Sequence, residues 1–251
     1  MMKDISILIV THNHSKYLES LINSLIKFEY KNVFFCDAAS TDKTPEILMS
    51  SPFKKNVLLK QELEGFSKNN NDLIRHFELK SQYYLLLNPD TYFTEDFLKV
   101  LYEQIQENPK IGIVAPLLKY PNGDIQVTWK KFPSVINVFK KRLGLLKATE
   151  EVQMKGPEID WCLGACMLID NSFLKSKGVL LDERYRLYCE DIDICFEAKV
   201  KEKKVVGVRE TFIYHHLNET SARNIFSKYN RWNINSIFKF IAKWNFKFFF
   251  R

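Results

Sequence analysis

The apolar residues in the first half of this chain fall into short runs that alternate with segments of helical spacing. The runs at Ile5–Val10 and Tyr83–Leu87 have the length and composition of buried strands. Ser15–Lys27 instead repeats its large apolar residues at intervals of three and four, which predicts a helix with one apolar face. Strands that alternate with helices favour an α/β fold in which a mostly parallel sheet carries helices on both faces. Further strands are expected at Val33–Cys36, Asn56–Lys60 and Ile111–Pro116, and further helices after Pro45, at Asn70–Leu79 and at Glu95–Asn108.

The second half of the chain is less regular. Asp160–Ile169 is apolar enough for a single strand, and Glu190–Lys201 predicts a helix that begins with a cluster of acids. Val205–Val208 predicts a strand that leads to a pair of histidines, Ser172–Lys177 a short helix, and 129–156 a basic loop. Because no repeat or low-complexity linker divides the chain, we expect one domain over 1–225, made of a regular half (1–118) and a less regular half (119–225), before a helical tail at 226–251.

The bulk composition narrows the class of protein. The chain has 251 residues, 46% of them hydrophobic, and a formal charge of +7, which favours an anionic partner. It contains no run of about 18 apolar residues, and its first residues lack the apolar core of a signal peptide, so we expect a cytoplasmic protein. Five cysteines, an odd number without a Cys-x-x-Cys pair, argue against a disulfide framework and favour core positions over a zinc site.

Two acidic elements are the strongest candidates for chemistry. Glu190, Asp191 and Asp193 lie within four positions, and Asp90 follows the apolar run that ends at Leu87. A carboxylate at the end of a strand can bind a divalent cation that neutralises a diphosphate, and another can act as a general base. Alternatively, Asp90 belongs to an ordinary turn, and the acids of the cluster stabilise the start of a helix through its dipole.

The histidine pair His215-His216 follows the last predicted strand. A neutral imidazole could complete a metal site with Asp90, although two adjacent histidines are more often a structural detail.

Polar residues also follow the second and third predicted strands. Asp37 ends a strand, and Ser40 and Asp42 follow in a loop that either binds a ribose or base or caps the next helix. The segment 65–71 offers a glycine, a lysine for phosphate and several amides, or is simply a polar loop. The chain contains neither Gly-x-Gly-x-x-Gly nor Gly-Lys-Ser/Thr, so dehydrogenase and P-loop functions have no motif behind them.

The end of the chain, 222–251, mixes aromatic residues with lysine and arginine. A basic aromatic helix suits an anionic bilayer surface, whereas the alternative is a helix packed on the domain. Single-stranded nucleic acid also binds such mixtures, but the two acidic elements would repel phosphate without a metal, so we expect no nucleic-acid partner.

These motifs, taken in order, resemble glycosyltransferase family 2, a family of inverting, metal-dependent enzymes with the GT-A (Rossmann-like) fold. The resemblance covers about 4–240. In detail, the chain is similar to bacterial O-antigen and capsule rhamnosyltransferases. It is carried by Thr11-His12-Asn13, Asp37 with Ser40-Thr41-Asp42, Gly65-Phe66, Asn88-Pro89-Asp90, Asp160-Trp161-Cys162, Gly164-Ala165, Tyr188-Cys189-Glu190-Asp191-Ile192-Asp193, His216 and Ser227-Lys228 with Arg231-Trp232.

The resemblance implies a role for each motif. Asp191 would be the general base with Glu190 assisting, and Asp90 and His216 would bind Mg²⁺ or Mn²⁺. The acceptor would contact Trp161, Gly164, Ala165 and Glu190. The nucleotide-sugar pocket, in the half spanning 1–118, would be lined by Thr11, Asn13, Asp37, Ser40, Asp42, Gly65, Phe66, Lys68, Asn71 and Asn88.

The resemblance further implies transfer of a sugar, first L-rhamnose from dTDP-rhamnose, to a lipid-linked oligosaccharide at the cytoplasmic face of the inner membrane. The sequence departs from the family where Asn88-Pro89-Asp90 replaces the frequent Asp-x-Asp, and where Ala38 replaces the asparagine that often follows the aspartate. A different donor such as a UDP-hexose, and a non-catalytic module that binds glycan or membrane, remain alternatives. The oligomeric state stays open.

Overall fold

The computed structural model describes residues 4–132, 157–177, 179–217 and 228–244. The sequence features expected at 133–156, at 218–227 and at the last residues of the tail lie outside this part of the chain. The strands are β1 (Ile5–Thr11), β2 (Val33–Ala38), β3 (Val57–Lys60), β4 (Tyr83–Leu87), β5 (Thr91–Tyr92), β6 (Ile111–Lys119), β7 (Trp129–Lys130), β8 (Glu158–Ile159), β9 (Trp161–Cys162), β10 (Cys166–Asp170) and β11 (Lys204–His215). The helices are α1 (Ser15–Lys27), α2 (Thr44–Ser50), α3 (Phe66–His76), α4 (Phe97–Glu107), α6 (Glu190–Val200) and α7 (Lys228–Trp244), with 3-10 turns at Lys54–Asn56 and Asn171–Lys177.

One mixed sheet organises the molecule, as expected for an α/β fold. Its strands run in the order β3-β2-β1-β4-β10-β6-β11-β5, and β8 pairs with β11 at the side. The pairs β1–β2, β1–β4, β2–β3 and β6–β11 are parallel, whereas β10 and β5 run antiparallel to their neighbours. Because β10 and β11 from the second half are inserted beside β4 and β6, the two halves of the chain share one sheet.

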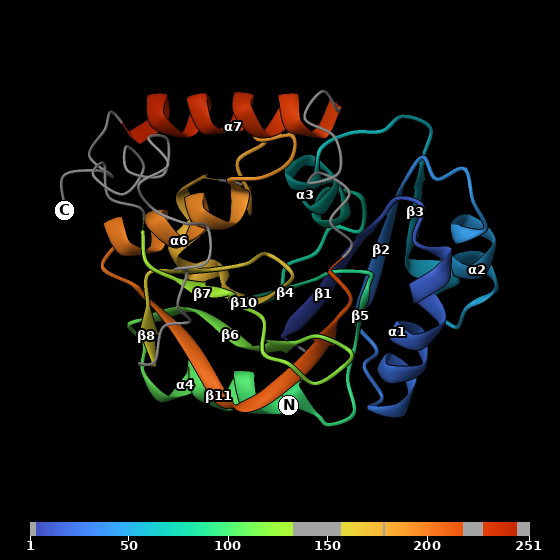
Figure 1. Cartoon of the computed structure of the whole chain (residues 1–251), viewed down its shortest axis with the longest axis horizontal. Helices are drawn as coiled ribbons and strands as arrows, with labels where there is room; N and C mark the ends of the chain where they lie inside the picture. The colour runs from blue at the N-terminus through green and yellow to red at the C-terminus, as the bar shows by residue number, and fades with distance from the viewer. Residues whose placement is uncertain (1–3, 133–156, 178, 218–227, 245–251) are drawn as a thin grey trace.

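Helices cover both faces of this sheet, which explains why its central strands are apolar on both sides. One hydrophobic cluster joins β1 and β4 to α1, α2 and α4, and a second cluster on the opposite face joins the sheet to α3 and α6. Helix α7 forms a further layer, which Figure 1 shows outside α6 and far from the sheet. Phe240 of α7 is buried against Tyr185 and Phe196, so the described part of the tail packs on the domain.

The structure corrects two expected strands. The predicted strand Asp160–Ile169 is broken into β9 and β10, because Leu163, Gly164 and Ala165 turn at the edge of the sheet. The predicted strand Val205–Val208 continues to His215 as β11, since an irregularity between Val208 and Phe212 lets the pairing with β6 resume.

Candidate active site

The polar motifs gather at one edge of the sheet because the parallel strands that carry them end there. Thr11 is the register partner of Asp37 across β1 and β2, and Asp90 follows the end of β4, the other neighbour of β1. The antiparallel strand β10 starts opposite the end of β4, which brings Gly164 and Ala165 to the same edge. Ligands of open α/β sheets bind at the carboxyl ends of such strands.

The loops after β1 and β2 hold each other through side-chain hydrogen bonds. The carboxylate of Asp37 accepts the Thr11 hydroxyl at 2.8 Å, the Ser40 hydroxyl at 2.6 Å and the Ser40 N–H at 3.0 Å. Asn13, whose φ of 58° is left-handed, accepts the N–H groups of Thr41 and Asp42 at its side-chain oxygen. The residues expected to line the nucleotide-sugar pocket are therefore brought together. Their side chains hydrogen-bond to one another and hold the two loops in place.

Asp42 fastens the start of α1 to the start of α2. Its carboxylate accepts the N–H of Ser15 at 3.1 Å and the N–H of Thr44 at 2.9 Å. Partial burial alone would raise the pKa of Asp42, but these hydrogen bonds outweigh it and lower the pKa to about 2. Asp42 thus accepts the first N–H of each helix, while the N-cap positions themselves are His14 and Lys43.

His215, and not the neighbouring His216, brings its side chain to the Asp90 carboxylate. Pairing of β11 with β5 sets His215 opposite Thr91, and the His215 Nε2 lies 3.4 Å from an oxygen of Asp90. The ring of His216 instead lies between the rings of Tyr17 and Tyr92, at centroid distances of 4.8 and 5.6 Å. Its backbone N–H donates to the carbonyl of Asp90 at 3.0 Å, so His216 supports the loop through its main chain.

Gln126 fixes which nitrogen of His215 faces Asp90. The Gln126 amide donates to the backbone carbonyl of His215 at 2.6 Å, so its oxygen is the atom that accepts from the His215 Nδ1 at 2.9 Å. With the proton on Nδ1, the Nε2 of a neutral imidazole presents a lone pair toward the carboxylate. A carboxylate oxygen and an imidazole lone pair that face each other fit a shared cation.

The donor set of this pair is incomplete without substrate. Among residues 4–132, 157–177, 179–217 and 228–244, no group of three or more histidine, cysteine or acidic side chains is arranged to hold a metal. Magnesium is commonly bound by one or two carboxylates together with substrate phosphates and water, so a partial protein site suits a diphosphate complex.

The acidic pair at the start of α6 lies beside this group. Asp191 accepts the backbone N–H of Gly164 at 3.3 Å and its other oxygen accepts the Ile192 N–H at 2.8 Å. The Asn88 N–H donates to the Ala165 carbonyl at 2.8 Å, which ties the Asp90 loop to the Gly164 turn. The predicted catalytic, acceptor and metal residues therefore share one edge of the sheet.

The two carboxylates differ in their surroundings. Glu190 is 9% exposed, and its Oε2 has no hydrogen-bond partner within the described structure. Burial, followed by the charge of Asp191, raises the pKa of Glu190 to about 8. Burial also raises the pKa of Asp191, but the two N–H groups it accepts oppose that shift. These surroundings favour the proton on Glu190 and the negative charge on Asp191.

The backbone is strained at the two residues directly before this pair. Tyr188 and Cys189 both have left-handed φ angles, 67° and 71°, directly before Glu190. Two consecutive non-glycine residues in this region cost energy and persist only when the surroundings fix them.

Gly65 and Phe66 contact Arg186, which lies in the segment directly before the acidic pair, rather than forming a phosphate loop. The Phe66 N–H donates to the Arg186 carbonyl at 2.8 Å, and a Cβ on Gly65 would lie 2.6 Å from that carbonyl oxygen. Glycine is thus required because two backbones meet here.

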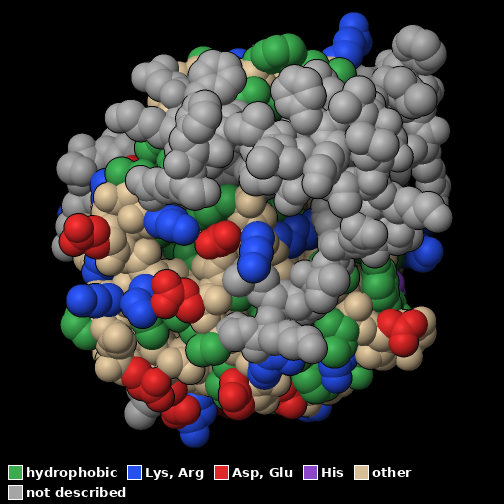
Figure 2. All heavy atoms as spheres, turned by 60° about the vertical axis from the view of Figure 1, so that its left-hand side comes forward, with side chains coloured by type: hydrophobic (Ala, Val, Ile, Leu, Met, Phe, Trp, Pro, Cys, Tyr) green, Lys and Arg blue, Asp and Glu red, His purple; other side chains and the backbone are tan. Residues whose placement is uncertain are grey.

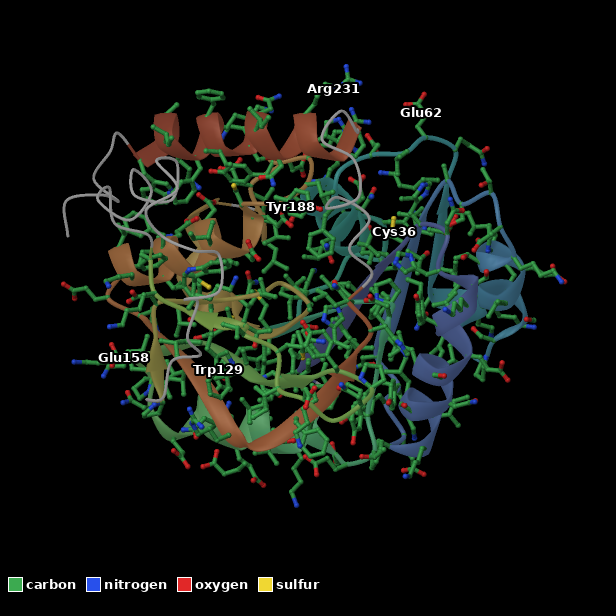
Figure 3. The ribbon with its side chains drawn as sticks, viewed as in Figure 1. Cys36, Glu62, Trp129, Glu158, Tyr188 and Arg231 are labelled. Atoms are coloured by element: carbon green, nitrogen blue, oxygen red, sulfur yellow. The ribbon has the colours of Figure 1, made fainter. Side chains whose placement is uncertain are left out.

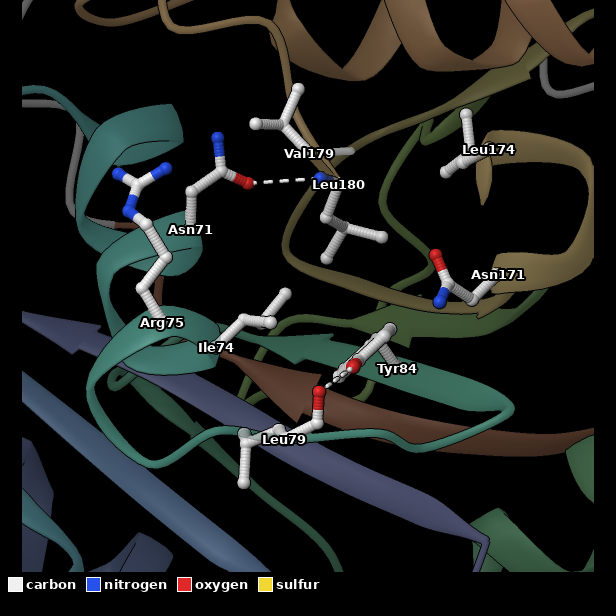
Figure 4. Close-up of a pocket in the computed structure, with 9 residues that line it drawn as sticks. All are labelled: Asn71, Ile74, Arg75, Leu79, Tyr84, Asn171, Leu174, Val179 and Leu180. Atoms are coloured by element: carbon white, nitrogen blue, oxygen red, sulfur yellow. Dashed lines mark hydrogen bonds between the residues drawn. The ribbon is translucent and has the colours of Figure 1, made fainter. Parts of the chain in front are cut away.

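Lys68 and Asn71, both expected to line the nucleotide-sugar pocket, have partners within the described structure. Lys68 pairs with Glu64 and Asp72. Both acids also pair with Lys60 of β3, the register partner of Ala38 at the end of β2. Asn71 binds the backbone of Leu180 and Leu181 at the mouth of a cavity of about 250 Å³, drawn in Figure 4. Since Tyr84, near the start of β4, lines that cavity, it lies away from the strand ends that carry the acids.

Trp161 lies at the rim of the site. Its indole N–H donates to the Lys131 carbonyl at 3.1 Å, and the Lys130 ammonium lies 5.3 Å from the ring centroid. The sequence placed the His215-His216 pair near a possible metal site, and the resemblance selected His216, whereas the structure brings the His215 ring to Asp90. The support that Gln126 gives to His215 was not predicted.

Comparison with known proteins gives a family and a fold. Residues 6–176 match the model described as glycosyl transferase family 2. The chain is 25% identical over 260 residues to the rhamnosyltransferase WbbL of Escherichia coli K12, covering 94% of this chain and 92% of that protein. It is 23% identical over 236 residues to an N-acetylglucosaminyl-diphospho-decaprenol L-rhamnosyltransferase of Mycobacterium tuberculosis, covering 86% and 76% of the two chains.

A solved structure shares the fold over nearly the whole chain. The mannosyltransferase PcManGT from Pyrobaculum calidifontis, solved with GDP-Man and Mn²⁺, aligns with a TM-score of 0.63 at 14% identity. The alignment covers 96% of this chain but 63% of that one, so the chain spans less than two thirds of this structural neighbour. The expected GT-A architecture, a curled and mostly parallel sheet flanked by helices, is thereby confirmed.

Proposed function

The chain belongs to glycosyl transferase family 2, and from that premise we propose that it transfers a sugar, with inversion, from a nucleoside diphosphate sugar to a lipid-linked glycan. The observation that carries the proposal is the hydrogen bond between Asn88 and Ala165, which sets the Asp90–His215 pair beside the Asp191–Glu190 pair. One pair suits a diphosphate with its cation, and the other suits an acceptor hydroxyl.

The acidic pair supplies the base. Asp191 carries the charge and takes the proton of the acceptor hydroxyl as that oxygen attacks the anomeric carbon of the donor. The bond from the anomeric carbon to the diphosphate breaks on the opposite side, so the configuration at this carbon is inverted. Glu190, whose pKa burial raises to about 8, would offer the acceptor a hydrogen-bond donor instead of a second charge.

The Asp90–His215 pair would bind the cation that accompanies the diphosphate leaving group. Asp90 and the Nε2 of His215 would hold Mg²⁺ or Mn²⁺, which stabilises charge on a departing diphosphate when it is bound. The structural neighbour PcManGT contains Mn²⁺ together with its nucleotide sugar, which supports this assignment. We place His215 in the role first expected of His216, because only the His215 ring reaches the carboxylate.

The names of the relatives suggest which donor and acceptor to test first. Both rhamnosyltransferases align over most of their length, and the second acts on a decaprenol-linked diphosphosugar by its name. L-rhamnose from dTDP-rhamnose is therefore the first donor to test, and a polyprenyl-diphosphate glycan the first acceptor. PcManGT, with its GDP-Man, makes other nucleotide sugars the necessary comparison.

The outer face of α7 is the surface that we propose contacts the membrane. Ile234, Ile237 and Phe238 of this helix are exposed, with Phe238 at 66%. Figure 3 shows the Arg231 side chain on the same outward side of α7. Apolar residues beside a cation suit the headgroup boundary of an anionic bilayer, where a lipid-linked acceptor is found. Within the described structure no helix combines the length and the apolar character that crossing a bilayer requires.

The coloured part of the face in Figure 2 does not favour nucleic acid as a partner. On the face seen in Figure 2, lysine and arginine side chains alternate with aspartate and glutamate over the part that is coloured. Nucleic-acid binding favours a continuous basic stripe along a face, and the coloured side chains do not form one there.

The experiment that tests the function is release of nucleoside diphosphate from a panel of nucleotide sugars. The panel contains dTDP-rhamnose, a UDP-hexose and GDP-mannose, each with and without a polyprenyl-diphosphate N-acetylglucosamine acceptor. We expect acceptor-dependent release from dTDP-rhamnose and, by NMR, a product of inverted anomeric configuration. Binding of a donor without release from any panel member would favour the non-catalytic alternative.

A further inference from the structure

The inner face of α7 grips the segment that leads into the acidic pair, residues 182–189, which we name the approach segment. The Lys239 ammonium donates to the Arg184 carbonyl at 2.7 Å, and the Ser236 hydroxyl donates to the Leu187 carbonyl at 2.9 Å. The Arg186 guanidinium lies 4.3 Å from the ring centroid of Trp232. Three successive turns of α7 thus contact this short segment, two of them at its backbone carbonyls.

Lys243 anchors this arrangement in a buried acidic cluster. Its ammonium lies 2.6 Å from Asp193 and 3.0 Å from Asp182, with Glu197 at 3.9 Å. Its side chain is 13% exposed and that of Asp193 is 2% exposed. Two basic residues of the tail that would suit a membrane surface by sequence, Lys239 and Lys243, are therefore directed into the protein.

Asp193 connects the anchor to the helix of the acidic pair. It lies on α6 two residues after Asp191, and its carboxylate also accepts the Trp244 indole N–H at 2.8 Å and the Tyr185 hydroxyl at 3.0 Å. Burial, followed by the charge of Asp193, raises the pKa of Tyr185, which keeps this hydroxyl a donor. The first turn of α6 is thereby fixed from α7 and from the approach segment at once.

The approach segment itself is held in a strained form. Tyr188 and Cys189 at its end have left-handed φ angles, and Figure 3 shows Tyr188 between α7 and the centre of the molecule. The other side of the segment is fixed by Phe66 and Gly65 through Arg186. Strain of this kind persists only under external constraint, and α7 supplies the constraint on the outer side.

We propose that α7 is the positioning element of the acidic pair, with Lys243 as its anchor: it holds the approach segment and the first turn of α6 so that Asp191 and Glu190 face the acceptor. This proposal rests on the proposed function, because it assigns a role toward that reaction. Lys243 touches neither reactive carboxylate and acts through Asp193 and the approach segment. It is a positioning residue and not a catalytic one.

The charges around the pair predict how loss of the anchor is seen. Glu190 faces Asp193 on its own helix, and Asp191 faces Lys130 on β7 and Cys162 on β9. Cys189 precedes both acids, and Lys243 reaches Asp193, Asp182 and Glu197 from α7. Removing the Lys243 charge makes the cluster beside the pair more negative by one unit, while Arg184 still pairs with Asp182 and Lys201 with Glu197. The pair then ionises less readily, which moves the acidic limb of kcat/KM to higher pH.

The test compares three variants of the full chain with wild type in the sugar-transfer assay. Lys243→Met keeps the aliphatic length and removes the charge, Lys243→Arg keeps the charge, and Lys99→Met on the surface of α4 is the matched control. We expect Lys243→Met to lower kcat between about 10- and 100-fold, the scale of small misplacements in a site, with donor KM unchanged. Its acidic limb should move to higher pH, and Lys243→Arg should keep the limb at the wild-type position.

A second variant keeps the test decisive if Lys243→Met does not fold. Ser236→Ala removes one hydroxyl that donates to the approach segment and leaves every charge in place. We expect kcat to fall several-fold with donor KM unchanged. A wild-type kcat in Ser236→Ala, or a Lys243→Met enzyme with wild-type kcat and limb, overturns the positioning role. If the wild-type chain transfers no sugar at all, the proposed function fails instead, so the two failures are distinguishable.

Discussion

Asp191 accepts the backbone N–H of Gly164 at 3.3 Å across the gap between α6 and the turn that separates β9 from β10. This contact distinguishes Asp191, which is half-buried, from the adjacent Glu190, which is buried. Asp191 has N–H donors for both oxygens, whereas the Oε2 of Glu190 has no partner in the described structure. The hydrogen bonds therefore favour the negative charge on Asp191, and burial favours the neutral form of Glu190.

Glu190→Gln should stabilise the protein in a pH-dependent way. The pKa of Glu190 rises on folding from an ordinary 4.5 to about 8, so between these values the folded state binds more protons than the unfolded state. The free energy of unfolding of the wild type must then fall as pH rises through this window, by as much as about 1.4 kcal/mol per pH unit. Glutamine does not titrate, so its advantage over wild type should grow from pH 5 to pH 8.5 in urea denaturation.

The control for this prediction is Glu62→Gln, which changes an exposed glutamate drawn in Figure 3. Its free energy of unfolding relative to wild type should not change between the two pH values. An equal effect of Glu190→Gln at pH 5 and pH 8.5 would mean that Glu190 is ionised in the folded protein throughout, against the assignment of the proton to this residue.

His215 should bind the divalent cation, and His216 should not. We expect Asp90→Asn and His215→Asn each to weaken Mn²⁺ binding in the presence of dTDP by about tenfold or more, measured by electron paramagnetic resonance without any turnover. Gln126→Leu should weaken it by about 10- to 100-fold, because the amide orients the His215 ring.

The neighbouring histidine is the natural control for this measurement. His216→Asn should leave Mn²⁺ affinity close to wild type, since its ring packs between Tyr17 and Tyr92. Weakened binding in His216→Asn together with wild-type binding in His215→Asn would return the role to His216, as the sequence first suggested.

Gly65→Ala should destabilise the fold and slow the reaction together. The added Cβ would lie 2.6 Å from the Arg186 carbonyl oxygen and 2.7 Å from its Cα, so the approach segment must move. Overpacking of this kind costs about 1–3 kcal/mol, or several degrees in Tm for a domain of this size. Gly164→Ala is the steric control for stability because its Cβ would meet Asp191 at an ordinary 3.5 Å. Equal Tm values for the two variants would show that Gly65 is not needed for the close approach.

The outer face of α7 should govern attachment to anionic lipid. Ile237→Asp and Phe238→Asp should each lower sedimentation with phosphatidylglycerol vesicles several-fold, because a charge replaces an apolar side chain at the bilayer surface. Ile26→Asp on α1 is the matched control, since Ile26 is 46% exposed and Ile237 is 45% exposed. If intact protein ignores the vesicles, or Ile26→Asp releases it equally, α7 is not the membrane contact.

The local spacing of apolar residues was sufficient to predict an element where that spacing alone determines its conformation. The predicted bounds of α1 and β4 match the structure, and α6 begins at Glu190 as expected. It was insufficient where a distant partner decides the conformation. An apolar run predicts Asp160–Ile169 as one strand, because nothing local shows that Gly164 turns out of the sheet to meet Asp191, 27 residues away.

The same reason explains the two site residues that were missed or misplaced. The choice between His215 and His216 depends on the pairing of β11 with β5. The sequence did not predict this pairing, because the polar residues 209–211 looked like the end of the strand. The inward direction of Lys243 depends on acids about 50 positions earlier in the chain. A basic, aromatic tail looks alike in sequence whether its cations face lipid or a buried acidic cluster.

Asp191→Asn tests the central claim, that this chain inverts a sugar linkage with Asp191 as its base, most directly. Asparagine keeps the size of the side chain but cannot accept the acceptor proton, so turnover of the accepted nucleotide sugar should fall by about 10²-fold or more. Donor affinity, measured by calorimetry, should stay near wild type because Asp90, His215 and the nucleotide loops are untouched. Glu190→Gln should retain more turnover than Asp191→Asn. Near-normal turnover in Asp191→Asn beside an inactive Glu190→Gln would contradict the account and assign the base to Glu190.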